Sequence, residues 1–487
     1  MITDNDIAKL ILGFKVRRLR LLNKTSYQTI SNETGLSVSY LNDIEKGKKY
    51  PKPDKITRLA KVFDLEYDEL VSLKSDKKLQ PVIELLNSDF FKHFPLEEFG
   101  VSLEKLIDVF SNSPDRFSAI ISTVLKMTRR YQIEQEQFYR IALRSFQDIH
   151  DNYFSTVEEA VKQFRAEQKT SIPIACSPGR LEVLLKSYGI RVDMETLAKH
   201  EKLSSFRSYY QPEKKLLYIN KALTENQVRF LLAKELGFHV LGIDDRPLET
   251  ELDRGVSFDK LFNNFRSSYF AASLLMEESE MVSDIREMAR NSDWSPDLIS
   301  SLLEKYQVTP ETLFQRLTNL LPHHFDIKDL FFIKLNSTKD IVAFDITKEL
   351  HLSRLQSPYQ NELNEHLCQR WVSISAIKNI RTRKSDYLID AQTSNYWQTN
   401  RSYFCISVAQ PAGFNQESPG SITLGLLMSE KVKATFNFVQ DPSIKEKTVN
   451  TTCERCSVFD CGSRVAAPTY IEKKDFQEML AAELSKL

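Results

Sequence analysis

The sequence predicts a multidomain protein that is mainly α-helical, with an α+β part toward the C-terminus. Three observations support this fold class. The 487 residues exceed what one hydrophobic core normally serves. Apolar residues recur at helical spacing in the N-terminal part, whereas alternating apolar runs typical of strands appear after residue 326. The content of 41% hydrophobic and 27% charged residues is that of a globular protein.

Changes in pattern divide the chain into four predicted parts. Residues 1–73 should form a five-helix domain, and the polar run 74–78 opens a helical connector that reaches residue 168. Residues 169–325 combine apolar helices, near 224–241 and 263–277, with short strands at 190–192 and 216–219. Residues 326–487 should be α+β, with strands at 331–335, 403–408 and 422–426 and a helix from about residue 474.

Composition narrows the classes of function. Lys plus Arg and Asp plus Glu each number 66, so the formal net charge is zero. The charge of the whole chain therefore indicates no polyanionic partner, and any such partner must be inferred from a local cluster of basic residues. The acidic start, Met1-Ile2-Thr3-Asp4, does not resemble a signal peptide, and no apolar stretch is long enough to span a membrane. We therefore expect a cytoplasmic protein with no membrane partner.

Two short helices joined by a sharp turn are predicted between Ser26 and Glu45. Ser26 and Ser37 should cap them, and Gly35 provides the left-handed backbone that ends the first. In the second helix Val38, Leu41 and Ile44 are expected to face inward. This arrangement is a helix-turn-helix, whose second helix can enter the major groove of DNA.

Local charge supports binding to double-stranded DNA. Residues 9–61 contain 13 Lys/Arg and 4 Asp/Glu, and such cations contact phosphates. Arg18, Arg20 and Lys52 are further candidates for phosphate contacts. The predicted DNA-binding residues are Arg17, Lys24, Ser26, Tyr27, Gln28, Ser37, Val38, Ser39, Tyr40, Asn42, Lys46, Lys48 and Lys49.

The N-terminal segment resembles the Cro/C1 (Xre-type) helix-turn-helix family. The resemblance lies in Val16–Arg20, Gly35-Leu36-Ser37, Ser39-Tyr40-Leu41, Ile44–Gly47 and Leu59-Ala60. Tyr27 departs from the family, in which Gln is commoner at that position. The alternative is a helical bundle with a solvated basic face.

Residues 228–242 resemble the zinc helix of ImmA/IrrE-like metallopeptidases. Those enzymes carry His-Glu-x-x-His, which places two imidazoles on one helix face with Glu as the base. Here Lys234 and Phe238 occupy the two histidine positions, Glu235 remains, and His239 is one residue late. Asn264 stands where a third, acidic ligand is usual. We therefore expect no catalytic residues and no enzyme activity, and interpret the domain as a degenerate peptidase kept as a ligand cleft or as a scaffold.

The last cysteines form a C-x2-C-x4-C cluster, Cys453, Cys456 and Cys461. Thiolates this close repel one another unless a metal neutralises them or they stay protonated. Cys368 is the leading candidate for a fourth ligand, and Cys405 is second. Spacing alone leaves open Zn²⁺, an iron–sulfur cluster such as 4Fe-4S, or three unliganded thiols.

The order of these parts resembles the short-chain fatty-acid-type transcriptional regulators. Further resemblance lies in Ile149–Phe154, Tyr269–Met276, Cys368–Trp371 and Cys453–Pro468. It implies a regulator that senses an acyl-CoA through its C-terminal part, with an iron–sulfur cluster in some members. We expect a homodimer on an operator, and the residues of the effector pocket stay unknown. The alternatives are an ImmA/IrrE-type peptidase that cleaves a repressor, and a phage-like repressor that needs no ligand.

Overall fold

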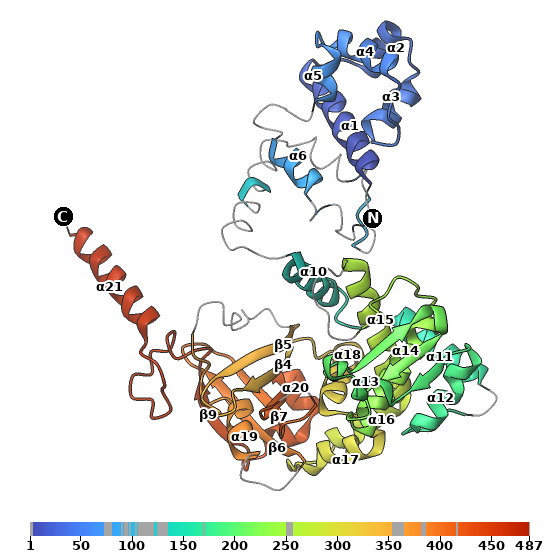
Figure 1. Cartoon of the computed structure of the whole chain (residues 1–487). Coiled ribbons are helices and arrows are strands. Elements are labelled where there is room, and N and C mark those ends of the chain that lie inside the picture. Colours follow the sequence, from blue (N-terminus) through green and yellow to red (C-terminus); the bar gives the residue numbers. More distant parts are fainter. Residues whose placement is uncertain are drawn as a thin grey trace. The chain divides into compact units, whose positions relative to one another are not determined.

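The computed structural model of the chain divides into two compact units. These are residues 1–143 with 253–262, and residues 144–252 with 263–487 (Figure 1). The expected connector run at 74–78 lies outside the described residues, and the predicted four-part division stays a prediction. No helix in the described ranges is long and apolar enough to cross a membrane. The structure describes residues 3–72, 80–88, 91, 96, 99–102, 105, 121–123, 135–168, 171–249, 257–352, 365–380, 386–414 and 417–486.

The first unit begins with the five helices that the sequence predicts. They are α1 (Asp4–Leu22), α2 (Tyr27–Thr34), α3 (Val38–Glu45), α4 (Pro53–Val62) and α5 (Tyr67–Val71). Their shared core includes Val16, Ile30, Leu41, Ile44 and Leu59, all fully buried. The multidomain fold class with an N-terminal five-helix domain is confirmed.

Helix α1 packs on both sides. At Gly13 an added Cβ would lie 2.4 Å from the carbonyl oxygen of Ile44, so only glycine permits this approach to the end of α3. Another side of α1, through Leu10 and Phe14, packs on Ile83 and Leu86 of α6 (Gln80–Asn87). Each side of the helix therefore contributes to a separate core.

The second unit contains a helical layer with a small sheet. The sheet has the order β1-β3-β2, with β1 parallel and β2 antiparallel to β3. Its strands are β1 (Arg191–Asp193), β2 (Ser208–Gln211) and β3 (Leu216–Ile219). The helices are α10 (Gln135–Ile149), α11 (Ser155–Glu167), α12 (Pro178–Ser187), α13 (Thr196–Lys199), α14 (Glu225–Val240), α15 (Phe258–Leu275), α16 (Glu278–Ala289), α17 (Asp297–Tyr306) and α18 (Pro310–Phe325), of which α10 and α15 begin in the first unit.

A six-stranded sheet follows in the order β5-β4-β8-β7-β6-β9. All its neighbours are antiparallel except β6 and β9, which are parallel. The predicted strands near 331, 403 and 422 are confirmed, and the predicted C-terminal helix is present. The strands are β4 (Leu330–Ser337), β5 (Phe344–His351), β6 (Leu388–Tyr396), β7 (Ser402–Gln410), β8 (Gly420–Leu427) and β9 (Lys445–Val449), and the helices are α19 (Val372–Ile380), α20 (Glu430–Thr435) and α21 (Thr469–Leu484).

Both faces of this sheet are covered. Along β4, Leu330 and Phe332 belong to the core shared with α18 and the other helices of the unit. Phe331 and Ile333 point to the other face and share a second core with α19. Because successive side chains alternate between faces, burial on both sides explains why these strands are almost continuously apolar.

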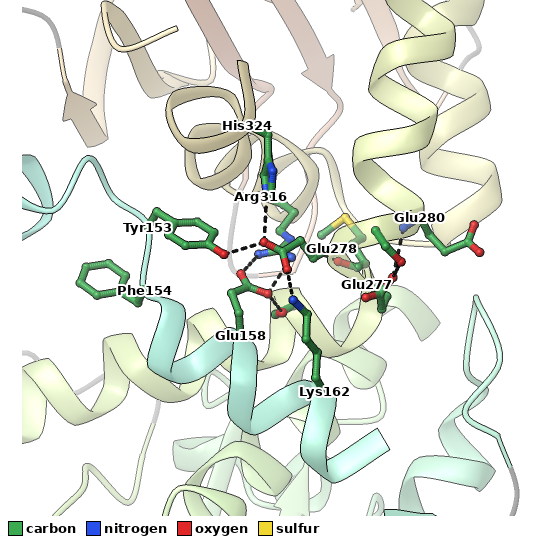
Figure 2. Close-up of polar contacts among 12 residues, drawn as sticks. Tyr153, Phe154, Glu158, Lys162, Glu277, Glu278, Glu280, Arg316 and His324 are labelled. Atoms are coloured by element: carbon green, nitrogen blue, oxygen red, sulfur yellow. Dashed lines mark hydrogen bonds and ion pairs between the residues drawn. The ribbon is translucent and has the colours of Figure 1, made fainter. Parts of the chain in front are cut away.

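A buried ion pair joins α11 to α18 (Figure 2). Both guanidinium nitrogens Nη1 and Nη2 of Arg316 donate to the two carboxylate oxygens of Glu158, at 3.1 Å for Nη2. The hydroxyls of Tyr269 and Ser273 also donate to Glu158, and Arg316 Nε donates to the carbonyl of Met276. The arrangement gives a buried carboxylate the multiple donors that it needs.

A second carboxylate lies beside this pair. Glu278 accepts from the Tyr153 hydroxyl at 2.6 Å and pairs with Lys162 and His324 (Figure 2). Burial alone would raise the pKa of Glu278, but these partners lower it to about 2. The network therefore links α11, α16 and the end of α18.

We predict that Arg316→Met destabilises the second unit by about 3–5 kcal/mol, because Glu158 would stay buried without its cation. Urea denaturation of the full chain measures the loss. Lys328→Met is the matched control, since Lys328 and Asp151 form a pair with side chains 54% and 45% exposed. An equal loss of unfolding free energy in the two variants would show that the buried pair of Glu158 and Arg316 contributes no more to stability than an exposed pair.

Candidate functional site

The turn between α2 and α3 has the geometry that the sequence predicts. Ser26 Oγ accepts from the backbone N–H of Thr29 at 3.1 Å, and Ser37 Oγ accepts from that of Tyr40 at 3.2 Å. Gly35 has a φ of 69° at the end of α2. The two caps and the left-handed glycine are therefore confirmed, and they define where each helix begins and ends.

A buried carboxylate holds α3 against α1 and α2. Glu45, at the end of α3, has a side chain that is only 1% exposed. It accepts from Arg20 Nε at 2.7 Å and from the Tyr27 hydroxyl at 2.6 Å. Burial, followed by this hydrogen bond, raises the pKa of Tyr27 to about 12. The contacts fix the orientation of α3.

These contacts change two expectations from the sequence. Arg20 was expected at a phosphate, but it is paired inside the domain with Glu45. Tyr27 is half-buried, and its hydroxyl binds Glu45, which gives a structural role to the residue that departs from the family pattern. The sequence analysis placed Glu45 only within the Ile44–Gly47 resemblance and did not predict its ion pair with Arg20.

The outer side of α3 carries polar side chains. Ser39 is exposed and Asn42 is half-buried, whereas Leu41 and Ile44 are buried. Val38 was expected to face inward, but it is 39% exposed because it occupies the first turn, ahead of the buried face. Its exposure agrees with its place among the predicted DNA-binding residues, although that role stays a prediction.

Cations flank this surface. Tyr40 has the ammonium groups of Lys49 and Lys55 at 5.4 and 4.4 Å from its ring centroid, and Lys49 also pairs with Asp43. All thirteen predicted DNA-binding residues lie in the first unit. Among them Lys24, Ser26, Gln28, Ser37, Val38, Ser39, Lys48 and Lys49 are exposed, and Arg17, Tyr27, Tyr40, Asn42 and Lys46 are partly exposed.

The four cysteines predicted as metal ligands line one pocket of about 250 Å³. Cys368, Cys453 and Cys456 are buried, and Cys461 is partly exposed. Cys405, the second candidate, lies in β7 within the core, where burial raises its pKa to about 12. The structure thus brings together the preferred set of four.

Arg464 organises the cysteine loop. It donates to the carbonyls of Cys453, Cys456 and Val458, each at 2.8 Å. The backbone N–H of Cys453 donates to the carbonyl of His366, which joins the loop to the segment before Cys368. The walls of the pocket are therefore held by hydrogen bonds to main-chain carbonyls.

The donor set suits a thiophilic metal. Burial, together with the neighbouring Cys453 and Cys456, raises the pKa of the Cys368 thiol, while the backbone N–H of Asn450 at 3.5 Å opposes that effect. Within the described residues, no three histidine, cysteine or carboxylate side chains already stand at metal-binding geometry. Cys368, Cys453, Cys456 and Cys461 are the residues that would hold such an ion, and they line one pocket.

Helix α14 does not carry the ligands of a peptidase zinc site. Its Glu235 is buried and accepts from Arg246 Nη2 at 2.9 Å on both oxygens, and from His239 Nε2 at 2.9 Å. Lys234 is half-buried, and burial lowers its pKa to about 8. The surviving carboxylate is therefore committed to a guanidinium.

Comparison with known proteins identifies two segments. Residues 16–70 match the helix-turn-helix family, and residues 185–318 match the IrrE N-terminal-like domain of peptidase family M78. No curated protein sequence matches the chain. A solved Mycobacterium tuberculosis transcriptional regulator is 18% identical with a TM-score of 0.48, and the alignment covers 66% of this chain and 92% of that one. The two family matches thus identify a helix-turn-helix domain near the N-terminus and a peptidase-like domain that lacks the zinc ligands on α14.

Proposed function

We propose that the protein is a sequence-specific DNA-binding transcriptional regulator. The observation that carries this proposal is the helix-turn-helix at residues 16–70, whose α3 presents an exposed polar side between cationic residues. Short polar side chains at the start of a recognition helix suit base edges, while cations suit phosphates. The cytoplasm is the proposed location.

Substitutions at two of the predicted DNA-binding residues should change DNA binding in different ways. Asn42→Ala should relax sequence choice by about 1–3 kcal/mol through loss of a base contact. Lys48→Ala should weaken all sequences alike and reduce the salt slope by about one. Selection of an operator with the full chain, followed by gel-shift titrations at several salt concentrations, measures both. Unchanged operator binding in both variants would refute this assignment of α3.

The four-cysteine pocket is the proposed site of Zn²⁺ or an iron–sulfur cluster. The group would be held by Cys368, Cys453, Cys456 and Cys461 and would cross-link the loop to the segment before α19. The chain itself supplies the thiols and, through Arg464, fixes the carbonyls around them. Neutralising the thiolates is the chemistry that the group would provide.

Cys456→Ser should lower the metal content of the purified chain and loosen the C-terminal part, because a thiolate ligand is lost. Cys405→Ala is the matched control, since that buried cysteine lies outside the pocket. Metal and sulfide analysis with an absorption spectrum, on anaerobically purified protein, measures the effect and separates zinc from iron. Absence of metal from the parent chain would overturn the proposal.

The proposed effector is an acyl-CoA, and the proposed assembly is a homodimer that spans two half-sites. The dimer is supported by the apolar side chains on α21 (Phe476, Met479, Leu480 and Leu484), which are exposed in the single chain. A ligand that prefers one arrangement of the two DNA-binding heads would change operator affinity. The ligand-independent repressor remains the competing function.

Propionyl-CoA should change the operator affinity of the full chain at least about fivefold, the lower range for an allosteric effector. Gel-shift titration measures this change, with free CoA as the control. Mass measurement of the complex should give two chains per operator. Equal affinity with and without each acyl-CoA tested would instead favour the ligand-independent repressor.

The protein is proposed not to be a peptidase. Lys234 and Phe238 cannot supply the two imidazoles of the zinc helix, and Glu235 is engaged by Arg246 instead of facing a metal-bound water. The match to the IrrE N-terminal-like domain supports descent from the peptidase fold. It does not restore the missing ligands at these positions.

A further inference from the structure

A second pocket, distinct from the cysteine site, lies beside α14. It is a small pocket that is partly open to solvent. Lys234 and Arg246 provide its cations, and Leu217, Leu231 and Leu248 provide apolar walls. Nothing in the proposed DNA or metal functions uses these residues.

Arg246 has an unused donor at this pocket. Its guanidinium lies 4.1 Å from the ring centroids of both Tyr210 and Phe238, and its Nη2 pairs with Glu235. The side chain is 4% exposed, yet among the described residues Nη1 has no hydrogen-bond partner. A buried N–H without an acceptor is unfavourable, so an oxygen atom from a ligand would stabilise this group.

Lys234 supplies a second cation at the same pocket. Within the described part of the chain, its Nζ has no hydrogen bond or ion pair and lies 5.9 Å from the Phe238 ring centroid. Arg207, Arg246 and Lys348 act on it as like charges, whereas Glu235 attracts it. Glu235 is already paired with Arg246. Among the described residues that line the pocket, the other carboxylate is the half-buried Glu249.

We propose that this pocket binds a small oxyanion, a carboxylate or a phosphate, between Lys234 Nζ and Arg246 Nη1. One ligand oxygen satisfies each donor, as expected for charge-assisted hydrogen bonds. The apolar walls favour a carboxylate with a short hydrocarbon body over bare phosphate. Lys234 stands where peptidases have a histidine that binds a metal cation, so the same position here favours an anion.

Isothermal titration calorimetry on the full chain tests the proposal, with inorganic phosphate and pentanoate as probes and pentanol as the neutral control. Pentanoate should bind and pentanol should not, because the two differ in the charged group. Lys234→Met removes the ammonium but leaves Arg246 and Glu235 paired, and it should weaken anion binding about tenfold or more. Lys214→Met, at an exposed lysine in the same unit, should leave binding unchanged.

A measurement on the parent chain keeps the test valid if Lys234→Met does not fold. Reductive methylation should modify Lys234, and saturating anion should protect it, as followed by peptide mass spectrometry. Binding of phosphate or pentanoate with this protection supports the site, and the tighter probe identifies the source of the oxyanion. Absence of binding by both anions at millimolar concentration, or equal binding by Lys234→Met, overturns the proposal. None of these measurements depends on DNA binding, so failure of this proposal can be distinguished from failure of the proposed function.

Discussion

The architecture of the second unit depends on the buried pair of Glu158 and Arg316. Two ions with side chains 2% and 0% exposed are tolerated only when their remaining hydrogen-bonding atoms are satisfied. Here the groups that donate to Glu158 lie on α15 and α18, and the carbonyl that accepts from Arg316 belongs to Met276, directly after α15. All of these hydrogen bonds form together only when α11, α15 and α18 pack in this one arrangement. Helix α18 leads directly into β4 and shares its core with the sheet, so the sheet and the loops at its ends are positioned by the same pair.

The same arrangement of buried charges recurs in places where the sequence suggests function. Glu45 pairs with Arg20, and Glu235 pairs with Arg246. Each carboxylate lies on a helix and receives a guanidinium from another segment of the chain. In both cases the ion pair engages a side chain to which the sequence pattern alone would give a functional role. For Arg20 that role is a phosphate contact, and for Glu235 it is that of a catalytic base. Buried ion pairs thus decide which charged residues remain available to ligands.

Elements that depend on residues close together in the sequence could be predicted correctly. Ser26, Gly35 and Ser37 act within their own turn, and the apolar strands near 331, 403 and 422 are long enough to be recognised. Strand β9 was not predicted, because Lys445–Val449 is short and mostly polar and becomes a strand through parallel pairing with β6. The need for a fourth thiol ligand led to the prediction of Cys368, 85 residues before Cys453, and the structure places it at the same pocket. Arg464 belongs to the Cys453–Pro468 resemblance, but its contacts with main-chain carbonyls could not be predicted from the sequence.

The cysteine loop is also connected to the exposed C-terminal helix. The backbone N–H of Tyr470, in the first turn of α21, donates to the carbonyl of Glu454 at 3.2 Å, and Arg455 lies 4.4 Å from the Tyr470 ring centroid. Glu454 and Arg455 are the two residues between Cys453 and Cys456. The residues between those two thiols are therefore in direct contact with the first turn of α21. Because α21 carries exposed apolar side chains, these contacts join the cysteine loop to the helix that presents that apolar surface.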